Sequence, residues 1–167
     1  MVGLTGSGQP GRKTGAEMQK LIFLMILLCV SQAQARSVYP NNDNWLYKKE
    51  DGAERSYMAV SLPHTFNATD ADNGGGYYRG RASYIKTFTS PCGEDELLFL
   101  EFEGIASRAE VFVNDIHLGG HEGPYTLFRI PVPSSSLQAK NRLRVEVDNS
   151  NYNRIAPLGG DFSIYGG

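Results

Sequence analysis

A glycine-rich stretch near the end of the sequence has the residue types of a ligand-binding loop. Residues 156–167 read APLGGDFSIYGG, which places Asp161 between Gly160 and Phe162. Glycine lets a backbone approach a bound molecule closely, and the ring of Phe162 can exclude water beside the carboxylate. Asp161 is therefore suited to bind sugar hydroxyls or a cation. The residues alone leave one alternative open, an aspartate that only caps a turn.

The stretch GGGYYRG at residues 74–80 is the second candidate. Tyrosine rings such as Tyr78 can stack on the C–H faces of a sugar, and Arg79 can donate several hydrogen bonds to hydroxyls. Adjacent residues of a strand point to opposite faces, so at least one of Tyr77 and Tyr78 is expected to pack in the core instead. A dinucleotide site is excluded, because no strand–helix–strand pattern surrounds these glycines.

The other reactive side chains do not form a recognisable catalytic set. His64 stands alone beside a proline, as structural histidines usually do. His117 and His121 are four residues apart on an expected turn rather than on a helix, so they do not make a ready metal pair. Carboxylates are plentiful but fall mostly in loops, and no two have the setting that two-carboxylate hydrolysis needs. Asn67 opens the sequon NAT, which matters only in a eukaryotic secretory pathway.

The composition is that of a globular protein. Hydrophobic residues make up 41% of the chain and charged residues 20%, which is too apolar for a disordered chain. The net charge of −2 argues against nucleic acid as a partner, because phosphate binding requires a basic face.

Residues 1–35 are predicted to contain a secretory signal peptide. Lys20 precedes the apolar run LIFLMILLCV, and SQAQA follows with alanines at positions 33 and 35. The run is too short to span a bilayer comfortably, and the alternative is a buried core helix. Met18 offers a second start of translation, which would make residues 1–17 an extension outside the protein.

Cleavage after Ala35 would remove three of the 16 basic residues and one of the 18 acidic residues, which leaves a net charge of −4. The mature chain would keep Cys92 alone, so no internal disulfide is expected. We expect residues 36–167 to be secreted or periplasmic and free of the membrane.

Period-two patterns after residue 36 predict an all-β domain. Asn114 and Asp115, in NDIHLGG, tolerate left-handed backbone and predict a tight hairpin. Several short strands separated by turns, without a helix pattern, are typical of a β-sandwich or jelly roll. Four segments alternate and gather apolar residues on one face: Ala82, Tyr84 and Phe88; Leu98, Leu100 and Phe102; Ala109, Val111 and Val113; Leu143, Val145 and Val147. In the first two segments the opposite face also carries apolar residues, namely Ile85, Leu97 and Phe99.

Five stretches, in this order along the chain, resemble the N-terminal sugar-binding domain of glycoside hydrolase family 2. They are LPHTFNATD, GGYYRGRASYIKTF, LEFEGIASRAEVFVNDIHLGGHEGPYTLFRIPV, NRLRVEVDNS and APLGGDFSIYGG. The family includes β-galactosidases, β-glucuronidases and β-mannosidases, and the resemblance covers residues 45–167. Its most specific parts are the run from FEG through A-x-V-x-V-N to H-x-G-x-Y-x-x-F, and the motif D-F-x-x-x-G-G.

The resemblance implies a jelly-roll, galactose-binding-like β-sandwich over residues 36–167, in a chain that ends before the family's immunoglobulin-like domain and catalytic TIM barrel. The family's two catalytic glutamates lie on that barrel, so no catalytic residue is assigned here. Asp161 matches the aspartate that contacts the sugar and, in some members, a sodium ion. Asn67 and Asn73 lie near a further sugar-contacting asparagine of the family, but their spacing departs from it.

The resulting hypothesis is the N-terminal fragment of a secreted family 2 hydrolase of β-galactosidase type. It would act on terminal β-glycosides by a retaining mechanism, together with the catalytic domain of the same protein. Asp161, Phe162, Tyr78 and Arg79 are its candidate sugar contacts. Asp161 is also the candidate sodium ligand, and sodium or magnesium is the cofactor implied for the full enzyme. The alternatives are a free-standing carbohydrate-binding module without hydrolase activity and a secreted interaction domain.

Overall fold

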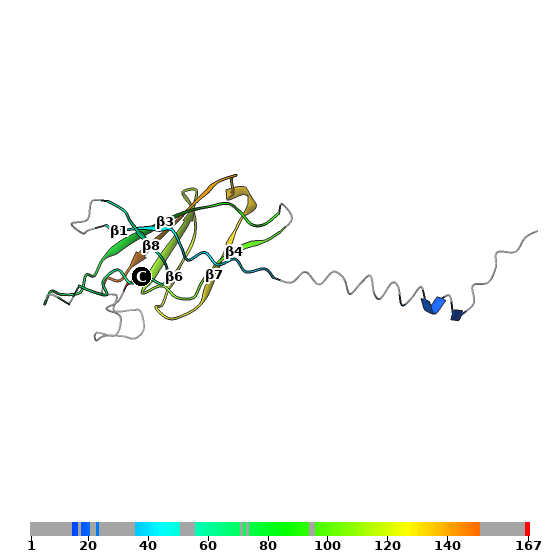
Figure 1. Ribbon diagram of the computed structural model, residues 1–167, viewed down its shortest axis with the longest axis horizontal. Coiled ribbons are helices and arrows are strands. Elements are labelled where there is room, and N and C mark those ends of the chain that lie inside the picture. Colours follow the sequence, from blue (N-terminus) through cyan, green and yellow to red (C-terminus); the bar gives the residue numbers. More distant parts are fainter. Residues whose placement is uncertain are drawn as a thin grey trace, which may run out of the picture. The chain divides into compact units, whose positions relative to one another are not determined.

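The computed structural model describes residues 15, 16, 18–20, 23, 36–50, 56–70, 72, 74–93, 96–150, 166 and 167 (Figure 1). The chain divides into two units, Met1–Val38 and Tyr39–Gly167, and the description below concerns the second. Most of the predicted signal segment lies outside the described residues, so it stays a prediction. None of the helical residues that are described belongs to a helix long and apolar enough to cross a membrane.

The alternating segments of the sequence form strands, and the prediction of an all-β, jelly-roll-type sandwich is confirmed. All strand pairs among the described residues are antiparallel. The elements are β1 (Trp45–Lys49), β2 (Met58–Val60), β3 (Arg81–Phe88), β4 (Leu98–Phe102), β5 (Arg108–Val113), β6 (Ile116–Glu122), β7 (Phe128–Val132), the short 3₁₀ helix η1 (Ser134–Ser136) and β8 (Asn141–Asp148).

Two sheets make up the described part of the sandwich. The larger has the strand order β2-β1-β3-β8-β5-β6, and the smaller pairs β4 with β7. Strands far apart in the sequence are therefore neighbours, since β8 lies between β3 and β5. Arg81, the first residue of β3, lies opposite Asp148, the last residue of β8, so the segments before residue 81 and after residue 148 leave the sheet at the same end, where the candidate site lies.

The core lies between the two sheets, and eight of its buried residues are ones that the alternation predicted: Ala82, Tyr84, Ala109, Val111, Val113, Leu143, Val145 and Val147. The other predicted inward residues, Phe88, Leu98, Leu100 and Phe102, are only partly buried. One row of buried side chains crosses four strands of the larger sheet, because Tyr47 lies opposite Tyr84, Tyr84 opposite Val145, and Val145 opposite Val111. Ile130 of the smaller sheet belongs to the same cluster. Full burial of such a side chain stabilises the fold by about 1.5–3 kcal/mol, so this core holds the loops at both ends of the sandwich.

The predicted hairpin between β5 and β6 is also confirmed. Asn114 and Asp115 have φ angles of 50° and 67°, the left-handed backbone that a two-residue hairpin loop requires. The Asn114 side chain also joins this turn to β8. Its Oδ1 accepts a bond of 2.9 Å from the Arg142 amide, and its Nδ2 donates to Asn141 Oδ1 over 2.9 Å.

Candidate functional site

Three segments that are distant in the sequence meet at one end of the sandwich, through two buried asparagines. Asn67 and Asn149 are both fully buried. Each donates a hydrogen bond of 3.1 Å from Nδ2 to the carbonyl of Tyr78. Asn149 also holds Gly80, because its Oδ1 accepts from the Gly80 amide over 2.8 Å. The backbone of residues 78–80 is thereby fixed from two sides.

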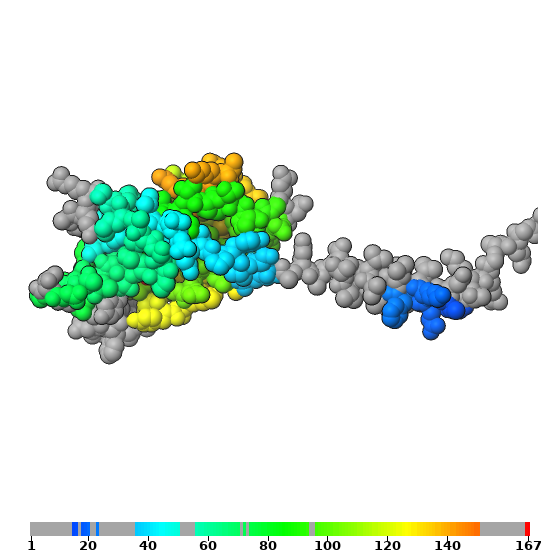
Figure 2. Space-filling view, viewed as in Figure 1, coloured from blue at the N-terminus to red at the C-terminus, as the bar shows by residue number. Residues whose placement is uncertain are grey.

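Asp70 completes the support of this backbone. Its Oδ2 accepts from the amide of Tyr78 over 2.9 Å, and its Oδ1 lies 3.2 Å from Lys49 Nζ. Lys49 Nζ also lies 5.1 Å from the centre of the Tyr78 ring. Side chains thus bind both the amide and the carbonyl of Tyr78, and the residues around it form a rigid end of the sandwich. In the space-filling view, a green segment coloured as residues between 70 and 80 projects from the unit (Figure 2).

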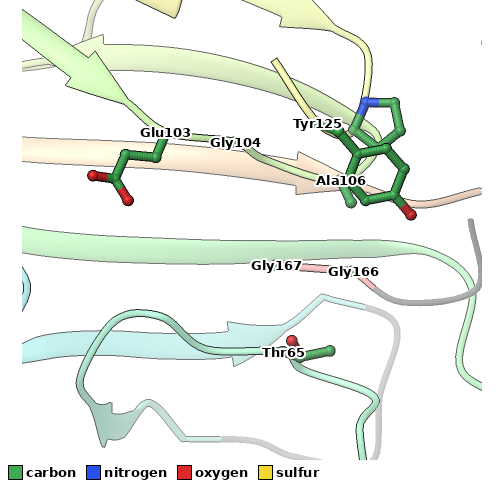
Figure 3. A pocket seen from close by; sticks show the side chains of 8 residues that line it. Thr65, Glu103, Gly104, Ala106, Tyr125, Gly166 and Gly167 are labelled. Carbon is green, nitrogen blue, oxygen red and sulfur yellow. The ribbon is translucent and has the colours of Figure 1, made fainter. Parts of the chain in front are cut away.

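Gly166 and Gly167, the last two residues of the D-F-x-x-x-G-G motif, are docked against this end. Phe66 donates from its amide to the carbonyl of Gly166 over 2.8 Å, and Ala106 donates to the carbonyl of Gly167 over 3.1 Å. The amide of Gly166 donates to Asn67 Oδ1 over 3.0 Å. Figure 3 shows the two glycines lying between Thr65 on one side and Ala106 on the other.

Both positions need glycine because their neighbours are too close for a side chain. A Cβ atom on Gly166 would overlap the ring of Phe66, and a Cβ atom on Gly167 would overlap the carbonyl oxygen of His64. The two glycines of the motif therefore have a steric role at the end of the fold.

His64 supports the loop that receives the glycines. Its ring is half-buried between two tyrosines, with its centre 4.7 Å from that of Tyr47 and 5.7 Å from that of Tyr84. Its Nδ1 lies 2.8 Å from Tyr84 Oη. Burial lowers the pKa of His64 from its usual value, and the charge of Lys49 lowers it further. Burial raises the pKa of Tyr84, so the phenol stays protonated and able to donate.

An open hollow of about 430 Å³ lies beside the docked glycines (Figure 3). Polar groups at its wall come from Thr65 and Glu103, and the ring of Tyr125 is 73% exposed there. A hydroxyl, a carboxylate and an exposed aromatic ring are groups that can contact a sugar. The hollow is completed by Gly104, Ala106, Pro124, Gly166 and Gly167.

The structure locates two of the four predicted sugar contacts. Tyr78 packs edge-on against Phe66, with ring centres 5.8 Å apart, and donates from its hydroxyl to the carbonyl of Arg81 over 2.8 Å. One of the two adjacent tyrosines therefore packs against the core, as expected. Arg79 follows it and is half-buried. Asp161 and Phe162 lie outside the described residues. The sugar-binding roles of all four stay predictions.

The three histidines have separate surroundings. His117 Nε2 lies 2.7 Å from Glu110 Oε2 on the outer face of the larger sheet. His121 Nε2 lies 2.7 Å from Thr126 Oγ1, and its ring stacks on Phe128. No group of three or more His, Cys, Asp or Glu side chains among the described residues could hold a metal ion.

Asn67 is the residue whose importance the sequence reasoning missed. Its sequon suggests an exposed glycosylation site, but its side chain is fully buried and hydrogen-bonded to Tyr78 and Gly166. A glycan could not be attached to this amide in the folded protein. The partners lie 11 and 99 residues away in the sequence, so no local pattern could have identified them.

Comparison with known proteins identifies relatives of the whole domain. No protein-family model matches the chain. A β-glucuronidase from Bacteroides fragilis is 35% identical over 160 residues, which cover 94% of this chain and 23% of the relative. A β-galactosidase from Thermoanaerobacterium thermosulfurigenes is 33% identical over 149 residues, which cover 79% of this chain and 20% of the relative.

Solved structures agree with these relatives. The crystal structure of a putative β-galactosidase from Bacteroides fragilis has a TM-score of 0.70 and 32% identity, over 80% of this chain and 22% of that chain. A Bacteroides uniformis β-glucuronidase has a TM-score of 0.69 and 32% identity, over 80% of this chain and 17% of that one. The chain spans about a fifth of the length of the proteins it matches. We therefore identify it as a homologue of the N-terminal region of glycoside hydrolase family 2 enzymes.

Proposed function

We propose that this chain is the N-terminal sugar-binding domain of a secreted glycoside hydrolase that removes terminal β-glycosides. The observation that carries the proposal is the 35% identity to a β-glucuronidase across 94% of the chain. The docking of Gly166 and Gly167 supports it, because it gives the end of the family motif a structural role in this fold. The sequence favours a β-galactosidase type, and the relatives include enzymes named for both sugars.

In this proposal Asp161 binds the sugar and the catalytic glutamates belong to another part of the enzyme. A carboxylate that accepts hydrogen bonds from two sugar hydroxyls orients the ring for attack at the anomeric carbon. A retaining glycosidase then forms a glycosyl-enzyme intermediate, which water hydrolyses. The domain positions the substrate and provides neither the nucleophile nor the acid/base.

The test uses the longest open reading frame that contains this chain. Hydrolysis of 4-nitrophenyl β-galactoside and 4-nitrophenyl β-glucuronide is measured for the natural protein and for Asp161→Asn. We expect Asp161→Asn to lower kcat/KM by about 10²-fold or more, the range for loss of a charged hydrogen-bonding partner. Asp72→Asn, which changes an exposed carboxylate, should leave kcat/KM unchanged. Equal rates for the natural protein and Asp161→Asn would refute the role of Asp161.

The hollow beside the docked glycines favours a second candidate, a carbohydrate-binding module without hydrolase activity. Tyr125 and Glu103 face open solvent there and offer a ring and a carboxylate to a sugar. Calorimetric titration of the isolated chain with galactose, lactose and glucuronic acid separates the candidates. A carbohydrate-binding module would bind at least one of these sugars on its own. A domain that supplies only part of an active site would bind none of them measurably.

Export and metal binding are further parts of the proposal. Mass spectrometry of the mature protein should place its first residue at Arg36 if the predicted signal is cleaved after Ala35. Sodium at Asp161, or magnesium elsewhere in the complete enzyme, is proposed from the family resemblance. The described residues contain no group of three or more His, Cys, Asp or Glu side chains that could hold a metal ion.

A further inference from the structure

We infer that Asn67 is a positioning residue, whose buried carboxamide ties the docked glycines to the rigid backbone around Tyr78. Its Nδ2 donates to the carbonyl of Tyr78 over 3.1 Å, and its Oδ1 accepts from the amide of Gly166 over 3.0 Å. The two ends of one side chain thus join parts of the chain that are 88 residues apart, from 78 to 166. Any effect of Asn67 on sugar binding rests on the proposed function, whereas the hydrogen bonds from Asn67 to Tyr78 and Gly166 do not.

The Tyr78 end of this tie is fixed independently of Asn67. Asn149 donates to the same carbonyl, and its Oδ1 accepts from the amide of Gly80. Asp70 accepts from the amide of Tyr78. Removal of the Asn67 side chain therefore leaves the backbone of residues 78–80 with three hydrogen bonds to the side chains of Asn149 and Asp70. The position that depends on Asn67 is that of Gly166.

At the other end, three hydrogen bonds between described residues hold the glycines, and one of them comes from a side chain. Phe66 and Ala106 donate backbone amides to the carbonyls of Gly166 and Gly167, and Asn67 Oδ1 accepts the amide of Gly166. Of these three, the bond from Asn67 is the one that truncation of a side chain removes. Without it the buried Gly166 amide loses its acceptor, which a folded protein rarely tolerates.

Asparagine suits this place because a carboxamide offers a donor and an acceptor on a short side chain. Serine is too short to reach both partners. Ionised aspartate can accept from Gly166 but cannot donate to Tyr78, and its charge would face the Tyr78 carbonyl. Protonated aspartic acid can do both. We therefore expect the new side chain in Asn67→Asp to bond to both Tyr78 and Gly166 only at a pH low enough to protonate its carboxyl group.

Asn141 provides a matched control within the same chain. It is also fully buried, and its carboxamide also bonds at both ends, with Oδ1 accepting from Gln138 and Nδ2 donating to the carbonyl of Gln138. Asn141 is the first residue of β8, so it lies at the opposite end of that strand from Asn149, which bonds to Tyr78 and Gly80. Loss of the Asn141 side chain should cost similar stability without touching Gly166.

The experiment measures amide hydrogen exchange in the 167-residue chain and in Asn67→Ser, Asn67→Asp and Asn141→Ser. In Asn67→Ser we expect the Gly166 and Phe66 amides to exchange about tenfold faster or more, relative to β5 and β8, as for loss of one buried hydrogen bond. Asn141→Ser should leave that ratio unchanged. In Asn67→Asp the ionised carboxylate is repelled by the Tyr78 carbonyl, and displacement from its site takes the acceptor away from Gly166. The protection factor of Gly166 should therefore rise as the pH falls and the carboxyl group is protonated, whereas in the natural chain it should not.

Two results would overturn the inference. One is unchanged Gly166 protection in Asn67→Ser, and the other is an equal loss in Asn141→Ser, which would indicate a general effect of stability. The proposed function fails separately, if Asp161→Asn leaves glycoside hydrolysis unchanged while Asn67→Ser still frees Gly166. If the positioning role of Asn67 and the proposed function are both correct, Asn67→Ser should lower kcat/KM in the complete enzyme, and Asn141→Ser should not.

Discussion

His64 and Tyr84 share a hydrogen bond of 2.8 Å between Nδ1 and Oη, directly behind the backbone that contacts Gly167. The pair joins the loop after β2 to the centre of the larger sheet. Neutral His64 with its proton on Nε2 accepts at Nδ1 from the buried phenol, whereas an imidazolium could only donate from Nδ1 to the phenol oxygen. The bond therefore links the protonation state of one residue to the loop that docks the glycines.

The first prediction is a loss of stability in mild acid. Because the pKa of His64 is lowered in the folded state, the unfolded chain binds a proton more readily. The contribution of His64 to stability should be complete above the unfolded pKa of about 6.5. It should decrease as the pH falls from there toward the lowered folded value. Urea unfolding of the natural chain and His64→Asn between pH 7.5 and 5 measures it. The idea fails if the stability difference between the two proteins is independent of pH.

The second prediction concerns the docked glycines. Gly166→Ala should destabilise the fold by about 1–3 kcal/mol, because the new methyl group overlaps the ring of Phe66. Gly76→Ala is the control, since a Cβ there meets no atom within 4 Å. It should change stability by less than about 0.5 kcal/mol. Urea unfolding gives both changes in stability, from the midpoints of unfolding when the two variants have equal slopes. Equal midpoints for the two variants would contradict the docking of Gly166 against Phe66.

The third prediction tests the core. Leu143→Ala should cost about 2–5 kcal/mol, because Leu143 is 1% exposed and its removal leaves a cavity between the sheets. Leu97 is 83% exposed, so Leu97→Ala should cost less than about 0.5 kcal/mol. Thermal unfolding monitored by circular dichroism compares the two. Similar melting temperatures would show that Leu143 is not a core residue.

The fourth prediction concerns the sequon at Asn67. In a eukaryotic secretory pathway, a glycan added before folding would prevent Asn67 from entering its buried site. Secretion of the natural sequence should then be poor, and Thr69→Ala, which removes the sequon at an exposed residue, should restore it. The measurement is the yield and glycan occupancy of secreted protein. A well-secreted chain that carries a glycan at Asn67 would show that the buried position is wrong.

The sequence by itself determined the fold class, the four strands β3, β4, β5 and β8, and the inward face of each of these strands. Alternation along residues such as Ala109, Val111 and Val113 is a local property, and burial of one face follows directly from it. The hairpin at Asn114 and Asp115 was equally local, because their tolerance of left-handed backbone depends on the residues themselves. The family resemblance was also readable, since its motifs are contiguous.

Only the tertiary structure decided what Asn67, His64 and Asn149 do. Their partners lie 99, 20 and 69 residues away, at Gly166, Tyr84 and Gly80. The contact of Asn149 with Gly80 exists because β8 pairs with β3, which is a result of sheet topology and not of any local pattern. A buried asparagine and an exposed sequon asparagine look the same in a sequence. Packing distinguishes them, because a buried amide is stable only where the fold brings partners to both of its ends.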